Sequence, residues 1–232
     1  MPDSSATLLE NLAALNRRIK DACAQSGRPR NTVKLMAVTK RFPLSVAASA
    51  VEAGLTLLGE NRIQEGVEKI QTASFEARWE LIGHLQSNKA QLAARHFDAV
   101  QSVDSVKLAG RLDRFATETG KKLPILLQVN TGEDPGKFGF MTENTASALD
   151  QILELPALQV DGLMTIAPLP STPESAKAAF EKLRDLRDRL AESTGRPLPE
   201  LSMGMSGDLE AAIAAGSTCI RVGSALFGQR PV

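Results

Sequence analysis

A lysine ends an apolar run near the start of the chain. In AVTKRFP, residues 37–43, Lys40 follows Val38 and Thr39 and stands three residues before a proline. A cation in this place is commonly a solvated rim residue whose aliphatic stem lies on the core. It is alternatively an amine at the mouth of a pocket, where it can condense with a carbonyl group. What lies near Lys40 in the fold decides between these interpretations.

Two turns near the other end of the sequence could hold a phosphate group. Each leads from an apolar run through small residues into a helical pattern: MGMSGD (203–208) and RVGSALFG (221–228). Gly207 and Gly223 let backbone N–H groups approach an anion, and Ser206 and Ser224 add hydroxyl donors. Either turn alone is explained more simply as a chain reversal with a capping serine. The two together favour a phosphate site.

The elements that must position these residues are readable from the apolar pattern. An amphipathic helix is expected over residues 1–26, because leucines recur there at three- and four-residue spacing. Helices are also expected at 105–119 and 173–194, with Gly120 and Gly195 at their ends. Candidate strands lie at 33–38, 55–59, 79–83, 97–102, 124–130, 158–166, 200–203 and 218–223.

Alternating strands and helices with short connections require parallel pairing through right-handed crossovers, and eight strands close a barrel. The sequence therefore predicts an α/β fold, a single (β/α)8 TIM barrel with an extra N-terminal helix, as one domain over residues 1–232. An open doubly wound sheet is the alternative. In a barrel the first and last strands pair, so Lys40, Arg221 and the turn after the seventh strand should lie within roughly 10 Å.

Composition excludes several classes of partner. The 27 Lys and Arg residues balance 27 Asp and Glu, so no electrostatic footprint for nucleic acid or an anionic membrane is present. Cys23 and Cys219 lie in apolar periodic segments, which favours buried free thiols in a reducing compartment over a disulfide or a metal site. No apolar run is long enough to cross a bilayer. We therefore expect a cytoplasmic protein, and the balanced charge fits a monomer.

Seven segments carry a resemblance to a known family. They are AVTKRFP, GENRIQEG (59–66), WELIGHLQSNK (79–89), QSVDS (101–105), GLMTIAP (162–168), LSMGMSGD (201–208) and IRVGSALFG (220–228). Together they resemble the pyridoxal phosphate homeostasis protein family, also called the YggS or PROSC family. The resemblance implies a barrel similar to the N-terminal domain of alanine racemases. It also implies that Lys40 holds pyridoxal 5'-phosphate as a Schiff base, for buffering or delivery to apo-enzymes inside the cell, with little or no catalysis.

The resemblance assigns further contacts to the cofactor. The phosphate would be held by Ser206, Gly207, Gly223 and Ser224. Arg221 would face the pyridine nitrogen, and Asn61 would line the ring pocket. An arginine there is a donor only and opposes protonation of the nitrogen, so carbanion chemistry is weakly supported. Taken alone, Arg221 could instead form a salt bridge at the barrel end, and Asn61 could cap a helix.

Three further residues are accessory candidates at the same face. His84, after the third strand, is either a proton shuttle or a hydrogen-bonded structural histidine. Lys137, in the turn-rich loop 132–140, is either solvated or adds positive field over the pocket mouth. The family more often has a serine before this lysine, where this chain has Gly136. Met164, in GLMTIAP, is the third candidate.

Two enzyme functions are the alternatives. A pyridoxal-phosphate-dependent amino-acid racemase needs a base on each face of the substrate, and in alanine racemases the second base is a tyrosine. This chain has no tyrosine, and we expect no second domain after the eighth strand, which would leave one face of the cofactor ring open. A sugar-phosphate barrel enzyme would use the phosphate turns without a cofactor, with Lys40 condensing with the substrate as in aldolases.

Overall fold

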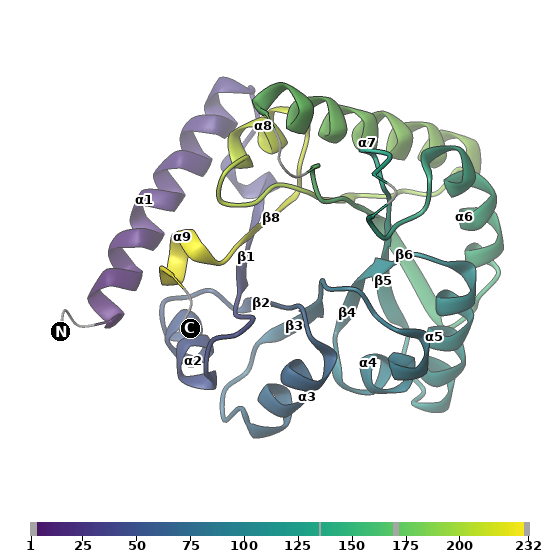
Figure 1. Cartoon of the computed structure of the whole chain (residues 1–232), viewed down its shortest axis with the longest axis horizontal. Helices are drawn as coiled ribbons and strands as arrows, with labels where there is room; N and C mark the ends of the chain where they lie inside the picture. The colour runs from purple at the N-terminus through teal and green to yellow at the C-terminus, as the bar shows by residue number, and fades with distance from the viewer. Residues whose placement is uncertain (1–3, 135, 169–171, 230–232) are drawn as a thin grey trace.

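The strands form a closed ring in the computed structural model, which describes residues 4–134, 136–168 and 172–229 (Figure 1). Eight parallel strands pair in chain order, and the last pairs with the first, with Met36 opposite Arg221. The predicted barrel is confirmed, and the open sheet is wrong. The strands are β1 (Lys34–Val38), β2 (Leu57–Glu60), β3 (Arg78–Leu81), β4 (Ala99–Val103), β5 (Leu123–Gln128), β6 (Leu158–Met164), β7 (Glu200–Ser202) and β8 (Cys219–Val222).

Helices surround the ring, and α1 (Ser4–Gln25) lies outside it against α8 (Leu209–Ala214) and α9 (Ser224–Phe227) (Figure 1). The helices predicted at 105–119 and 173–194 are confirmed to within one residue at each end, and the glycine expected to end the second, Gly195, has a φ of 63°. The helix predicted at 1–26 is confirmed from Ser4 to Gln25, and residues 1–3 lie outside the described part of the chain. No described helix is both long enough and apolar enough to cross a bilayer. The helices are α1 (Ser4–Gln25), α2 (Leu44–Glu52), α3 (Ile63–Thr72), α4 (Ala90–His96), α5 (Val106–Glu118), α6 (Thr145–Leu153), α7 (Pro173–Thr194), α8 (Leu209–Ala214) and α9 (Ser224–Phe227).

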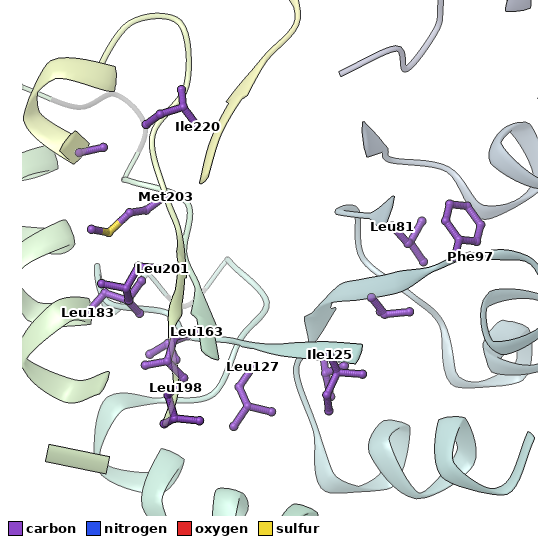
Figure 2. Packing of buried hydrophobic residues seen from close by; sticks show 14 of the residues in the cluster. Leu81, Phe97, Ile125, Leu127, Leu163, Leu183, Leu198, Leu201, Met203 and Ile220 are labelled. Atoms are coloured by element: carbon purple, nitrogen blue, oxygen red, sulfur yellow. The ribbon is translucent and has the colours of Figure 1, made fainter. Parts of the chain in front are cut away.

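The main core lies between the strands and the helices. Side chains such as Leu81, Leu127 and Leu163 point outward from the ring and pack there (Figure 2). A second, smaller apolar cluster fills part of the barrel lumen, and it consists of Met36, Val38, Ile82 and Cys219. The strands looked weakly hydrophobic in sequence because only alternate residues join the main core, and several lumen positions are polar.

Both cysteines are free and buried, as predicted. Burial raises the pKa of the Cys219 thiol to about 12. At pH 8 such a thiol is a thiolate in about one molecule in ten thousand, and the thiolate is the reactive form.

We therefore expect neither Cys23 nor Cys219 to react with a thiol reagent in the folded protein at pH 8, because both side chains are inaccessible. Two thiols per chain should react at once in denaturant. Colorimetric titration with an aromatic disulfide checks this, and rapid labelling of the native protein would contradict the packing of the lumen.

Candidate functional site

A cavity of about 560 Å³ opens at the C-terminal end of the barrel. Loops after several strands contribute to its wall, as expected for a barrel site. Nine of the ten predicted site residues line it: Lys40, Asn61, His84, Lys137, Ser206, Gly207, Arg221, Gly223 and Ser224. Met164 does not line it, since its side chain is fully buried in β6. An accessory role for Met164 therefore has no direct contact with the cavity to support it.

The turn that carries Lys40 is held on both sides by α3. Lys69 Nζ donates to the carbonyl oxygen of Thr39 at 2.8 Å, directly before Lys40. The N–H of Arg41, directly after it, donates to Glu65 Oε1 at 2.5 Å, and Arg41 adopts a φ of 64°. A left-handed arginine is uncommon and persists only where its surroundings fix it. The backbone at Lys40 is therefore rigidly placed at the cavity.

The buried side chain of Glu60 contacts both Thr39 and Lys69 in this arrangement. Glu60 Oε1 accepts hydrogen bonds from Thr39 Oγ1 at 2.6 Å and from Lys69 Nζ at 2.7 Å. Its Oε2 has no hydrogen-bond partner among the described residues, and burial raises the pKa of the carboxyl group. We call Thr39, Glu60, Glu65 and Lys69 the lysine-turn clamp. The sequence analysis missed it: the Glu65–Lys69 pair has the i, i+4 spacing of a helix, but nothing local links Glu60 to them.

The two small-residue turns approach each other at the cavity. The hydroxyl groups of Ser206 and Ser224 lie 3.4 Å apart. A Cβ on Gly223 would stand 3.2 Å from the carbonyl oxygen of Val38, so glycine permits the close approach of β8 to the end of β1. A Cβ on Gly207 would meet nothing within 4 Å, so the space beside this residue is open. An anion in that space would face two hydroxyl groups and first-turn amides, which have no intrahelical acceptor.

The N-terminal helix supports both turns from outside the barrel. Arg18 on α1 forms an ion pair with Glu210 on α8 and donates to the carbonyl oxygen of Ser206 at 3.2 Å. Asn11, two turns earlier on α1, donates to the carbonyl oxygen of Leu226 in α9 at 2.9 Å. The extra helix is therefore part of the scaffold of the site.

Replacing Arg18 with alanine should weaken binding of phosphate-containing ligands about threefold, because the backbone at Ser206 loses its anchor. The free energy of unfolding should fall by no more than about 1 kcal/mol, since the ion pair with Glu210 is half-exposed. Titration calorimetry and thermal unfolding measure the two effects. Arg17→Ala, at an exposed position of the same helix, is the matched control, and equal losses in both variants would contradict the anchoring role.

Arg221 is a buried cation with neutral partners. Its side chain donates from Nη1 to Ser202 Oγ at 2.7 Å and from Nη2 to the carbonyl oxygen of Thr165 at 2.8 Å. The salt-bridge alternative is therefore wrong for the described residues. Burial lowers the pKa of the guanidinium group. Further N–H groups remain available toward the cavity, because a guanidinium carries five donors.

The remaining predicted residues lie around the cavity mouth. Asn61 is not the N-cap of α3, because that position belongs to Arg62, so the capping alternative is wrong. His84 Nδ1 lies 3.0 Å from Asp104 Oδ2, and its ring stacks on Phe138 with centroids 3.5 Å apart. His84 thus has the contacts of a structural histidine while it also lines the cavity.

Lys137 is tethered in the loop that lies over the mouth. Its Nζ donates to the carbonyl oxygen of Ala167 at 2.8 Å, so its position is fixed by contacts with the chain. Gly136, where the family more often has serine, contributes only backbone, and its N–H donates to Asp134 Oδ1 at 2.9 Å. Of the two phenylalanines in this loop, Phe140 is buried and Phe138 is exposed.

Comparison with known proteins identifies the family. Residues 11–231 match the alanine racemase N-terminal domain family. The chain is 40% identical over 225 residues to the pyridoxal phosphate homeostasis protein of Haemophilus influenzae, which covers 95% of this chain and 94% of that protein. It is 41% identical over 227 residues to the protein of the same name from Pseudomonas aeruginosa, with 97% and 96% covered. The chain belongs to the pyridoxal phosphate homeostasis protein family.

Solved structures extend the comparison within this family and beyond it. PipY of Synechococcus elongatus is 40% identical, and its structures without and with bound pyridoxal phosphate superpose with TM-scores of 0.86 and 0.84 over 95% of this chain and all of PipY. An alanine racemase of Clostridium difficile shares the fold with a TM-score of 0.77 at 17% identity. The match spans 98% of this chain but only 58% of that racemase.

Proposed function

We propose that the chain binds pyridoxal 5'-phosphate reversibly as a Schiff base on Lys40 and buffers or delivers it, with little or no catalysis. The observation that carries this proposal is that Lys40, the buried Arg221 and the two serine-glycine turns all line a single cavity of about 560 Å³. The names of the family relatives and the bound cofactor in PipY support the same ligand.

The donor set of the cavity fits this cofactor. Ser206, Ser224 and the amides of their turns are neutral donors that suit a phosphate group, and the open space at Gly207 admits it. Arg221 offers N–H groups to a ring nitrogen that accepts hydrogen bonds. Lys40 supplies the amine. When bound, the cofactor supplies an aldehyde for this amine and an electron-withdrawing ring.

The positive charge of Arg221 also favours weak catalysis. A permanently cationic donor opposes protonation of the pyridine nitrogen, so the ring withdraws electrons less strongly than it would beside a carboxylate. The second base that a racemase needs is a tyrosine in alanine racemases, and this chain has none. These features favour a carrier over an amino-acid racemase.

Reconstitution tests the ligand. Purified protein mixed with pyridoxal phosphate should develop an absorbance band near the edge of the visible range, and dialysis should remove it slowly. A protein that stays colourless would contradict the proposal. It would favour the alternative of a sugar-phosphate enzyme in which Lys40 condenses with the substrate.

Solvent deuterium exchange tests the absence of catalysis. Alanine and other amino acids incubated with the loaded protein in D₂O should incorporate deuterium at the α-carbon no faster than with free cofactor. Incorporation at enzyme-like turnover, read by mass spectrometry, would favour the racemase instead.

Delivery and location complete the proposal. We propose that the barrel acts as one domain and as a monomer in the cytoplasm, where apo-enzymes that need the cofactor are the recipients. Buried free thiols fit a reducing compartment. The rate at which an apo-enzyme acquires the cofactor from the loaded protein should differ from the rate with the same concentration of free cofactor. Analytical ultracentrifugation gives the mass of the protein and so tests the monomer.

A further inference from the structure

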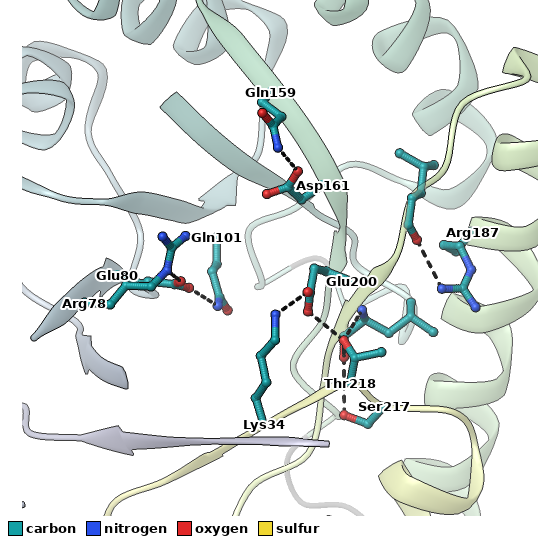
Figure 3. A network of polar contacts seen from close by, with 12 residues as sticks. Lys34, Arg78, Glu80, Gln101, Gln159, Asp161, Arg187, Glu200, Ser217 and Thr218 are labelled. Atoms are coloured by element: carbon teal, nitrogen blue, oxygen red, sulfur yellow. Dashed lines mark hydrogen bonds and ion pairs between the residues drawn. The ribbon is translucent and has the colours of Figure 1, made fainter. Parts of the chain in front are cut away.

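A line of hydrogen-bonded polar side chains crosses the barrel lumen from its N-terminal end to Arg221. Arg78 Nε donates to Glu80 Oε1 at 2.7 Å, and Gln101 Nε2 donates to Glu80 Oε2 at 2.6 Å (Figure 3). Ser202 Oγ donates to Gln101 Oε1 at 2.6 Å, and Arg221 Nη1 donates to Ser202 Oγ at 2.7 Å. The four residues from Glu80 to Arg221 are all at least 92% buried.

The direction of these hydrogen bonds is fixed by the carboxylate at one end. Glu80, when ionised, only accepts, so the amide NH₂ group of Gln101 must face it. The amide oxygen of Gln101 then faces Ser202, which must donate to it. The lone pairs of Ser202 are left to accept from Arg221. Between Arg221 and Glu80, every donor therefore points toward Glu80.

This line connects a buried cation to a buried anion that it does not touch. Burying a guanidinium group without a counter-charge costs free energy, and both direct partners of Arg221 are neutral. Hydrogen bonds in a low-dielectric interior polarise one another when they are aligned. Hydrogen bonds through Gln101 and Ser202 therefore link Glu80 to Arg221.

We propose that Glu80 and Gln101 are positioning residues for Arg221, which they orient toward the cofactor site through Ser202. Neither Glu80 nor Gln101 lines the cofactor cavity; both line a second cavity of about 540 Å³ at the opposite end of the barrel. The inference rests on the proposed function, because it assigns these residues a role in holding the same ligand.

The second cavity also provides a matched control. Lys34 and Glu200 form another ion pair there, and Glu200 Oε2 accepts from Thr218 Oγ1 at 2.8 Å (Figure 3). This pair has no hydrogen bond to Gln101. Glu200→Gln therefore removes one carboxylate from the same cavity and leaves the line to Arg221 intact.

The apo-protein gives a test that needs no cofactor. The Nη1 N–H signal of Arg221, which donates to Ser202 and is assigned with Arg221→Lys, should exchange slowly with solvent in the wild-type protein, and Gln101→Met should speed the exchange at least about tenfold. Met has a length similar to that of Gln, and thermal unfolding will show that the variant is folded. Unchanged exchange in folded Gln101→Met would overturn the inference.

Cofactor binding gives the second test. Gln101→Met should weaken the affinity for pyridoxal phosphate about tenfold and shift the absorbance band. Glu80→Gln retains a carbonyl acceptor for Gln101, so its loss should be about threefold, and Glu200→Gln should match the wild type. Equal affinities in all four proteins would overturn the inference. If the wild type fails to bind the cofactor, the proposed function fails, and the exchange of the Arg221 signals still decides the role of Glu80 and Gln101.

Discussion

Lys40→Ala will abolish the absorbance band of the protein reconstituted with pyridoxal phosphate, because Lys137, the other described lysine that lines the cavity, is held by the carbonyl oxygen of Ala167. The turn at Lys40 is held from both sides by the lysine-turn clamp, so the backbone should keep its course in the variant. The phosphate turns and Arg221 remain, and we expect residual non-covalent binding that is weaker by more than about tenfold. Absorbance and equilibrium dialysis separate these two effects.

Two further lysine variants sharpen this experiment. Lys40→Arg keeps a positive charge but supplies a guanidinium, which is not a nucleophile here, so the band should also be lost. Lys34→Ala changes the lysine that begins β1 and lines the cavity at the opposite end of the barrel, so it should keep the band. If Lys40→Ala retains the band, a different lysine holds the cofactor.

Lys69→Met should reduce the free energy of unfolding by about 3–5 kcal/mol, because it leaves Glu60 buried without its counter-charge. The Glu60 side chain is fully buried, and that of Lys69 is only 8% exposed. Chemical denaturation measures the loss. Lys177→Met, which breaks an exposed pair with Glu181 at the i, i+4 spacing that Lys69 has to Glu65, should cost less than about 1 kcal/mol.

The loss in Lys69→Met should depend on pH. Burial already raises the pKa of Glu60, and removal of Lys69 raises it further, so the folded variant binds a proton more tightly than the unfolded chain. The protonated form stabilises the fold below the unfolded value near 4.3, and this stability is lost as pH rises through the folded pKa. The variant should therefore be closer to the wild type at pH 5 than at pH 8. A constant difference would contradict an ionised Glu60 in the wild type.

The same variant should affect the site. Without Lys69 the carbonyl oxygen of Thr39 loses a buried donor, and the turn at Lys40 becomes free to move. We expect slower formation of the absorbance band in folded Lys69→Met. The double variant Glu60→Gln, Lys69→Met removes both charges and should recover part of the stability, which separates burial of charge from loss of packing.

Much of the fold was predictable from local patterns. The apolar runs located all eight strands, including β7, which is three residues long and has Leu201 as its one apolar residue. Chain order and pairing of the first strand with the last then brought Lys40, Arg221 and the phosphate turns to one end of the barrel. These residues were found because each lies at or just after a strand end, a position that sequence spacing reveals.

The contacts that sequence reasoning missed join residues that are distant in the chain. Gln101 on β4 meets Ser202 on β7 across the lumen, 101 positions away in the chain, and neither residue type signals the other. His84 and Phe138 come from loops after different strands, and their stacking depends on how one loop folds over the barrel end. Register across non-adjacent strands and loop conformation carry no short-range pattern.

The support that α1 gives to both phosphate turns bears on how the protein is made. The first helix leaves the ribosome long before α8 and α9, its packing partners at the end of the chain (Figure 1). Until α8 and α9 have been synthesised, the apolar face of α1 lacks these packing partners and is exposed to chaperones and to other nascent chains. We therefore expect the cavity to form only after β8 has been synthesised, because this strand pairs with β1 and brings Arg221 to the cavity that Lys40 lines.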